Sequence, residues 1–169
     1  FWKEVGGVMT ADPKLVPEAR TLRRMSYAEA AELTRHGAGV LHSESIQPLA
    51  RARIPGRVLC VREPQDAGTL VAAEGAGREA VGIACRRNVM LARLEGNEPE
   101  TVRTKVEAAL AHEGVEALHL GERGATLELL VPWSESLARA LVAAAPRVSL
   151  ERELATVAAV GCGAAEGAL

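Results

Sequence analysis

Apolar residues follow a helical spacing over residues 26–37 and no regular spacing over residues 1–24. The helical segment has Ser26 as its N-cap, Glu29 in position to complete a capping box, and Gly37 as its end. Residues 1–24 are interrupted by glycine and proline, so we expect a loop with short extended pieces that is ordered by what it packs against.

A second helix, a strand and a linker are expected next. Residues 43–53 favour a short helix, in which Pro48 should impose a late start or a bend. Residues 57–63, which read RVLCVRE, are typical of a strand because they are rich in valine and leucine. Residues 72–79 are small and polar, contain glycine and separate two apolar runs, so we place a linker and a domain boundary there.

The second half of the chain alternates between strand and helix patterns. Two strands, AVGIAC and NVMLARLEG, should precede a helix that is capped by Asn97 and ended by Gly114. Two further strands should form a hairpin through the turn GERG, and Ser134 should begin another helix before the last strand, ELATVAAVG. This order is the βαββαβ arrangement of ferredoxin-like domains, which fixes no activity by itself.

The bulk composition narrows the function classes. The chain has 169 residues, enough for one medium domain or two small ones, and 48% of them are hydrophobic. A net charge of −2 and an aromatic content of 2% argue against a nucleic-acid partner. No apolar run approaches the roughly 20 residues of a membrane span. We therefore expect a soluble globular protein without a nucleic-acid or membrane partner.

Cysteine and histidine spacing points to neither a disulfide framework nor a metal site. Cys60, Cys85 and Cys162 are odd in number and far apart, which favours the reduced thiols of a cytoplasmic protein. The four histidines are equally scattered and form no pair with metal-ligand spacing. We expect no metal to be held by these residues and a cytoplasmic location.

Two motifs have a superficial likeness to known sites. The tail GCGAAEG, residues 161–167, lacks the G-x-G-x-x-G spacing of a dinucleotide-binding turn. His42 lies beside serine in LHSES, but no G-x-S-x-G elbow is present and neighbours in sequence are rarely triad partners in space. We expect neither motif to form the site that its letters suggest.

The first residues form either a turn or a loop that holds a charged ligand. Pro13 fixes the backbone between Asp12 and Lys14, while Gly6 and Gly7 permit the close approach that phosphates or a purine ring require. Taken alone, these residues favour a simple Asp-Pro turn, and the sequence contains no P-loop motif.

A longer resemblance, over residues 2–55, favours a loop that holds a ligand over a simple turn. WKEVGGVMTADPKLVPEA, followed by SYAEAAEL, GAGVLH and RIP, resembles the late part of the catalytic domain of aspartate kinases over residues 2–55. The resemblance implies an α/β chain, with a C-terminal fragment of an amino-acid-kinase fold followed by a ferredoxin-like ACT regulatory domain. It also implies phosphorylation of L-aspartate by ATP to 4-phospho-L-aspartate, the first step toward lysine, threonine and methionine.

The resemblance implies contacts with ATP for five residues of the segment 1–19, which we call the opening segment. Lys3 and Glu4 stand where a Thr-Asp pair of the family meets the nucleotide, and Met9 stands where an aromatic or apolar residue often covers the adenine. Asp12 matches the family's aspartate, and Lys14 replaces an arginine that contacts phosphate, keeping the charge without the bidentate fork. No catalytic residue or metal ligand is assigned, and Mg²⁺ should be held mainly by residues absent from this chain.

Two departures from the family pattern concern activity and regulation. Gly39 occupies the position of a lysine that reaches the ATP phosphates, which removes a cation that would stabilise the transferring phosphoryl group. The turn expected to bind an amino-acid effector is shorter than in the family, and it comprises Glu95, Gly96, Asn97 and Glu98.

The implied organisation has four parts. Residues 1–71 form the C-terminal part of the kinase domain, 72–79 the linker, 80–153 the ACT domain, and 154–169 the start of a second ACT repeat. L-Aspartate, ATP, an amino-acid effector and a second copy bound through ACT domains are the expected partners of a longer parent protein. This chain alone should be inactive. The alternative is a non-catalytic regulatory or assembly protein with a degenerate kinase remnant.

Overall fold

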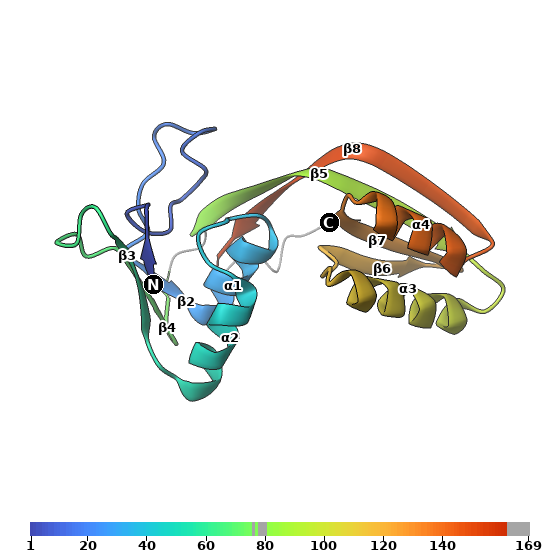
Figure 1. Cartoon of the computed structure of the whole chain (residues 1–169), viewed down its shortest axis with the longest axis horizontal. Coiled ribbons are helices and arrows are strands. Elements are labelled where there is room, and N and C mark those ends of the chain that lie inside the picture. The colour runs from blue at the N-terminus through green and yellow to red at the C-terminus, as the bar shows by residue number, and fades with distance from the viewer. Residues whose placement is uncertain (76, 78–80, 162–169) are drawn as a thin grey trace. The chain divides into compact units, whose positions relative to one another are not determined.

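The computed structural model describes residues 1–75, 77 and 81–161. Its internal contacts divide it into two compact units, which we call unit 1 and unit 2. Unit 1 comprises Phe1–Cys85 and the described residues from Val157 onward, and unit 2 comprises Arg86–Thr156. Figure 1 shows a sheet and a pair of helices in each unit, so each is described separately below.

The division between the units falls after the predicted linker. Residues 72–79 precede the end of the first part of unit 1, and 76, 78 and 79 lie outside the described residues. Residues 154–160 continue the last strand, while 162–169, with Cys162 and most of the GCGAAEG tail, lie outside the described residues. The predicted domain ranges therefore stay predictions.

Unit 1 is built on a four-stranded mixed sheet with the order β1-β3-β4-β2. Its strands are β1 (Trp2–Lys3), β2 (Arg24–Ser26), β3 (Gly56–Cys60) and β4 (Thr69–Ala72). The central pair β3 and β4 is antiparallel, and the outer strands β1 and β2 each run parallel to their neighbour. The loop between β1 and β2, seen as the blue trace at the top of Figure 1, contains most of the opening segment.

Helices α1 (Tyr27–Arg35) and α2 (Ser43–Ala52) pack side by side in unit 1 (Figure 1). The predicted capping box is confirmed, because the Ser26 side chain accepts from the Glu29 N–H at 3.1 Å and the Glu29 carboxylate accepts from the Ser26 N–H. The predicted late start of the second helix was wrong, since α2 begins at Ser43 with Pro48 inside it.

Packing explains why α2 tolerates its proline. Pro48 removes one backbone hydrogen bond from the helix. Ile46, only 2% exposed, belongs to the same buried cluster as Leu33 and Leu41, so burial of the first turn offsets that loss. The buried residues of this cluster, which we call the unit 1 core, are Val8, Leu22, Met25, Ala30, Leu33, Leu41, Ile46, Val58, Val71, Val81, Ala84 and Val160.

A bend before β4 is held by charge and by a glycine. The carboxylate of Asp66 accepts from the Gly68 N–H at 2.7 Å and pairs with Arg23 at 2.6 Å. These contacts hold the pKa of Asp66 below its ordinary value of 3.8, with the Arg23 hydrogen bond as the larger cause. Gly68 has a φ of 58°, and a Cβ there would overlap the carbonyl oxygen of Val58.

The second sheet contains the predicted βαββαβ order. Its elements are β5 (Gly82–Glu95), α3 (Pro99–Glu113), β6 (His119–Arg123), β7 (Thr126–Pro132), α4 (Glu135–Ala144) and β8 (Arg147–Val160). The strand order β6-β7-β5-β8 places the first strand in the centre beside the last, as in ferredoxin-like domains. The ferredoxin-like prediction is therefore confirmed.

Several local predictions in this region need correction. The two strands AVGIAC and NVMLARLEG are one strand, β5, in which Asn88 has a φ of 59°. The hairpin turn is not GERG, because Arg123 pairs with Thr126 and leaves only Gly124 and Ala125 between them. A two-residue connection with a positive φ at Gly124 suits the twist of an antiparallel pair.

In unit 2, one predicted helix cap was wrong and two predicted helix ends are confirmed. Glu98, not Asn97, is the N-cap of α3, because Pro99 takes the first helical position. Gly114 ends α3 with a φ of 63°, as predicted. Ser134 caps α4, as predicted, by accepting from the Leu137 N–H at 3.1 Å.

One cluster of apolar side chains from the sheet and both helices forms the core of unit 2. Its buried members are Met90, Ala92, Leu94, Val102, Val106, Leu110, Leu127, Leu129, Val131, Leu137, Ala138, Leu141 and Ala144. They come from alternate positions of β5 and β7 and from i, i+4 and i+8 of α3, which explains why the periodicity predicted these elements. Among the described residues, no helix is long and apolar enough to cross a membrane.

Truncation of Leu129 should destabilise unit 2. Leu129 is fully buried at the centre of β7, so Leu129→Ala should lower the free energy of unfolding by about 2–5 kcal/mol through lost burial and a cavity. Val142→Ala on α4 is the control, because Val142 is 54% exposed and its truncation should change the free energy by no more than about 0.5 kcal/mol. Urea unfolding of both variants measures the difference, and equal values would contradict this description of the core.

The carboxyl group of Asp66 should titrate below 3.8, and Arg23→Gln should move its pKa up toward that value. Because the folded-state pKa is depressed, the Asp66 contribution to stability is present above the unfolded pKa of about 3.9 and is lost as the pH falls through the folded pKa. Carbon-detected NMR titration of the Asp66 carboxyl group checks this. A pKa that is the same in both proteins would show that Arg23 is not the cause.

Candidate functional site

A cavity of about 490 Å³ lies in unit 1 beside the opening segment. Three stretches of chain form its wall, namely the opening segment, the connection after α1, and the start of β5. Its lining residues are Lys3, Glu4, Val5, Gly7, Val8, Met9, Ala11, Asp12, Pro13, Lys14, Gly37, Ala38, Gly39, Val40, Ile83, Ala84 and Cys85. All of them belong to unit 1, so that unit contains the whole lining.

One wall of the cavity belongs to residues 8–22, which we call the opening loop. Its two arms are joined by backbone hydrogen bonds, from the Leu22 N–H to the Val8 carbonyl and from the Thr10 N–H to the Arg20 carbonyl, each at 2.8 Å. The Ile83 N–H donates to the Thr10 carbonyl at 2.7 Å, which links the loop to β5. The opening loop is therefore an ordered hairpin-like excursion, although it has no apolar period.

The tip of the opening loop is a local turn. The Asp12 carboxylate accepts from the Lys14 N–H at 2.9 Å, and the Asp12 carbonyl accepts from the N–H groups of Leu15 and Val16. This explains why an aspartate precedes Pro13, since Asx turns use such a side chain. This segment can form a turn and also contact a ligand, because the turn itself presents Lys14 at the cavity.

The five residues predicted for an ATP site come together around this one cavity. Lys3, Glu4, Met9, Asp12 and Lys14 all line it. Met9 is half-buried, whereas the four charged side chains are exposed. Glu4 is also 3.6 Å from Arg62 across an exposed ion pair. The cavity thus combines an apolar wall with two ammonium and two carboxylate groups. The apolar wall and the ammonium groups suit a planar apolar ring joined to an anionic group.

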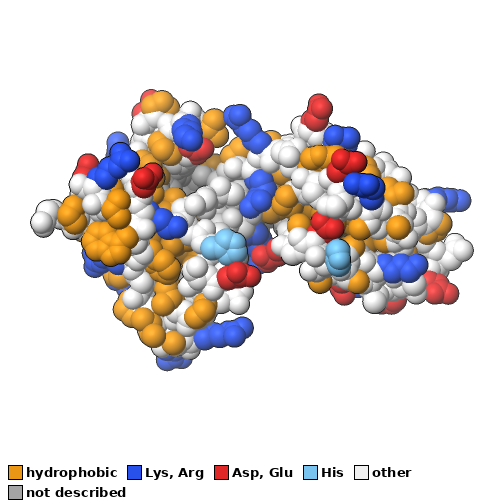
Figure 2. Space-filling view, in the orientation of Figure 1, with side chains coloured by type: hydrophobic (Ala, Val, Ile, Leu, Met, Phe, Trp, Pro, Cys, Tyr) orange, Lys and Arg blue, Asp and Glu red, His pale blue; other side chains and the backbone are white. Residues whose placement is uncertain are grey.

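Gly39 lines the same cavity as the two lysines. A Cβ built on Gly39 meets nothing within 4 Å, so space for a larger side chain exists there. Gly39 therefore lines the cavity without contributing any charge to it. Figure 2 shows acidic and basic side chains intermingled on the face it displays, without a continuous basic patch on that face.

Sequence reasoning missed one wall of the cavity. Ile83, Ala84 and Cys85 line it from the start of β5, a strand that the sequence assigned entirely to the regulatory module. Cys85 is a free, half-buried thiol, and Cys60 is free and buried. Nothing in the spacing of AVGIAC distinguishes a cavity wall from the core of a sheet, since both require alternating apolar residues.

The predicted effector turn joins β5 to α3. Glu95 is exposed and lies 3.8 Å from Arg147, and its carboxylate also accepts from the Thr126 hydroxyl at 3.3 Å. A Cβ on Gly96 would approach a methyl group of Val102 to 2.6 Å, so the turn packs closely onto α3. The neighbouring cavity measures about 10 Å³, which is space for one water. Within the described residues, no cluster of three or more potential metal ligands is present.

Comparisons with known proteins agree with this arrangement. The amino acid kinase family matches residues 1–60. The aspartokinase of Candida albicans is 44% identical over 78 residues, which is 46% of this chain and 14% of that protein. This chain therefore spans only a small part of that curated relative.

Solved structures match almost the whole chain. E. coli aspartokinase III in complex with aspartate and ADP, in its R-state, has a TM-score of 0.77 at 28% identity, over 94% of this chain and 38% of that one. The same enzyme in complex with lysine and aspartate, in its T-state, has a TM-score of 0.73 at 28% identity, again over 94% and 38%. The predicted fold, a kinase fragment followed by an ACT-like domain, is thereby confirmed. The match to the amino acid kinase family and the similarity to aspartokinases along most of the chain support the aspartate kinase family, with this chain corresponding to a segment of its longer members.

Proposed function

We propose that this chain forms part of an aspartate kinase that acts in the cytoplasm, with the cavity of unit 1 as part of its ATP site. The observation that carries the proposal is that five residues singled out from the sequence line a single cavity of about 490 Å³. The match to an aspartokinase solved with aspartate and ADP supports it.

The proposed reaction is transfer of the γ-phosphoryl group of ATP to the β-carboxylate of L-aspartate. A carboxylate oxygen bonds to the γ-phosphorus, the bond from that phosphorus to the β,γ-bridging oxygen breaks, and ADP and 4-phospho-L-aspartate result. Such transfer depends on positioning and on neutralising charge rather than on covalent chemistry by the protein. The product would feed the synthesis of lysine, threonine and methionine.

Each wall of the cavity would have its own role. Lys3 and Lys14 would neutralise phosphate oxygens as point charges, because an ammonium lacks the planar fork of arginine. Met9, Val40 and Ile83 would contact the adenine ring from the apolar wall. Mg²⁺, which would add charge neutralisation, would be held mainly by residues of the longer protein. The chain alone would then bind nucleotide weakly and turn over no substrate.

Unit 2 would act as the regulatory module. The match to an aspartokinase solved with lysine supports an amino-acid effector. Two copies of the chain would pair through the ferredoxin-like sheet of this unit. Glu95, Gly96, Asn97 and Glu98 remain the proposed effector contacts. The cavity beside them is about 10 Å³, so an effector would lie on the surface of the turn.

A non-catalytic regulatory or assembly protein is the second candidate. Gly39 favours it, because the lining of the cavity has no side chain where the family pattern has a lysine. Lys14 and the ordered opening loop favour the enzyme, because together they place a cation at the cavity, which phosphate binding requires. Activity of the full-length protein separates the two candidates.

Lys14→Ala should weaken ATP binding by the full-length protein about tenfold, the usual effect of losing one hydrogen bond to a charged group. Lys105→Ala is the matched control, because Lys105 is an exposed lysine on α3 that does not line the cavity. Titration calorimetry with ATP measures both variants. An unchanged dissociation constant for Lys14→Ala would remove the opening loop from the nucleotide site.

Gly39→Lys should raise kcat/KM for ATP in aspartyl phosphate formation, because it adds a cation where nothing blocks the new side chain. Gly39→Ala is the control that adds a Cβ without charge and should leave kcat/KM unchanged. Hydroxamate trapping of the acyl phosphate measures the product. If neither the native protein nor Gly39→Lys forms aspartyl phosphate, the non-catalytic candidate is favoured.

A further inference from the structure

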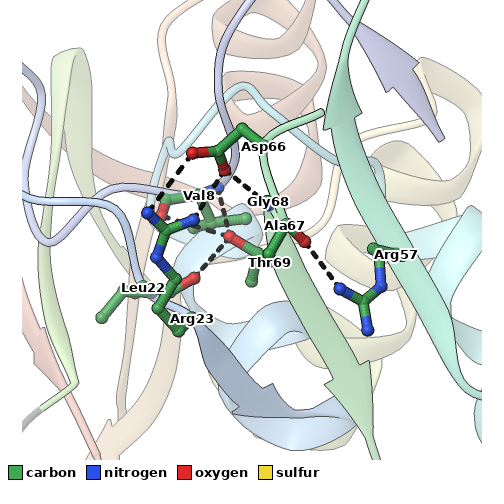
Figure 3. A network of polar contacts seen from close by, with 8 residues as sticks. All are labelled: Val8, Leu22, Arg23, Arg57, Asp66, Ala67, Gly68 and Thr69. Carbon is green, nitrogen blue, oxygen red and sulfur yellow. Dashed lines mark hydrogen bonds and ion pairs between the residues drawn. The ribbon is translucent and has the colours of Figure 1, made fainter. Parts of the chain in front are cut away.

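The two ends of the opening loop meet at one buried side chain. Thr69, at the start of β4, is fully buried. Its hydroxyl oxygen accepts from the Val8 N–H at 2.8 Å, and its O–H donates to the Leu22 carbonyl at 2.6 Å (Figure 3). Val8 and Leu22 are the first and last residues of the loop, so one hydroxyl group satisfies a backbone group at each end.

A hydroxyl is suited to this place because it donates and accepts at once. Val8 and Leu22 are 3% and 6% exposed, so water cannot readily replace the side chain. Without the hydroxyl, a buried N–H and a buried carbonyl would each lose a partner, which is costly away from water. Valine has nearly the shape of threonine and lacks the hydroxyl, so it isolates the hydrogen bonds from the packing.

The surroundings of Thr69 leave its hydroxyl little freedom. Gly68 and Asp66 fix the bend that precedes it, and Asp66 also holds Arg23, the residue after the loop (Figure 3). On the other side, a Cβ on Gly7 would lie 2.6 Å from the Thr69 hydroxyl oxygen, and Gly7 has a φ of 135°. Gly7 is therefore required for the close approach of the loop to Thr69.

A second side chain, that of Thr10, also bonds to the backbone of the loop, but its hydrogen bond is exposed whereas those of Thr69 are buried. The Thr10 hydroxyl accepts from the Arg20 N–H at 3.0 Å in an exposed position. Since water competes there, the buried bonds of Thr69 contribute more to the order of the loop. Met9 follows Val8 directly, and Asp12 and Lys14 lie further along the same arm. Displacement of Val8 would therefore displace the side chains that line the cavity.

We propose that Thr69 is a positioning residue for nucleotide binding, whose hydroxyl holds the opening loop in the arrangement that presents Met9 and Lys14 to the cavity. Thr69 does not line the cavity, so it acts through the loop and not on the ligand. This inference rests on the proposed function, because the ligand it concerns is the nucleotide of that proposal.

The test compares Thr69→Val with Thr69→Ser in the full-length protein. Thr69→Val should weaken ATP binding at least about fivefold, and Thr69→Ser, which keeps the hydroxyl, should remain within about twofold of the native protein. The amide of Val8 should exchange with solvent faster in Thr69→Val than in Thr69→Ser. Leu129→Ala is the control for general destabilisation, because its cavity lies in unit 2 and its ATP affinity should be native.

The outcomes separate this inference from the proposed function. If the native protein does not bind ATP, the proposed function fails and the inference fails with it. If the native protein binds ATP and Lys14→Ala weakens binding, but Thr69→Val binds like the native protein, the inference alone is overturned. An equal loss of affinity in Leu129→Ala would also overturn it, because the effect would then be general.

If Thr69→Val does not fold, a second pair of variants tests the same inference. Gly7→Ala presses a methyl group onto the same hydroxyl, whereas Gly6→Ala meets nothing within 4 Å. Gly7→Ala should speed exchange of the Val8 amide with solvent and weaken ATP binding at least about fivefold, whereas Gly6→Ala should change neither. Because Gly7 also lines the cavity, weaker binding without faster Val8 exchange would be a direct effect on the cavity wall and would overturn the inference, as would equal affinity in the two variants.

Discussion

The N–H and carbonyl groups of a loop that has no apolar face need hydrogen-bond partners elsewhere in the chain, and this constraint shapes unit 1. The opening loop cannot bury a stripe of its own side chains, so its order comes from hydrogen bonds between its arms, to β5 and to one buried hydroxyl. The bend before β4, the glycine at position 7 and the Arg23–Asp66 pair all serve that arrangement. The cavity is bounded by this loop, by the connection after α1 and by the start of β5.

Much of this fold could be predicted from local chemistry. The capping box at Ser26, the cap at Ser134 and the stop at Gly114 depend on neighbours within four residues, which a sequence displays directly. The errors arose where distant residues decide. Ile46 packing lets α2 begin ahead of its proline, and strand pairing, not the letters GERG, sets where the hairpin turns. β5 continues through Asn88 as one strand, with β7 paired along Val89–Glu95 and β8 as its other neighbour in the sheet.

The residues of the candidate site likewise include some that the sequence could predict and others that only the fold reveals. Lys3, Met9 and Lys14 could be singled out because they lie in one ordered run of sequence that resembles a known family. Ile83 and Cys85 could not, because only the fold brings the start of β5 to the opening loop. Thr69 escaped notice for a further reason, since its importance lies in two hydrogen bonds to backbone groups that are 61 and 47 residues away in sequence. No local pattern encodes such a bond.

Two glycines near the cavity differ in what they permit. At Gly7 any side chain would collide with the base of the loop, while at Gly39 open space surrounds the missing Cβ. Substitution at position 39 can therefore change the charge of the cavity without repacking its walls, whereas substitution at position 7 changes the walls themselves. Position 39 is therefore a place where one exchange can alter which ligand charge the cavity favours while the scaffold that shapes the cavity stays fixed.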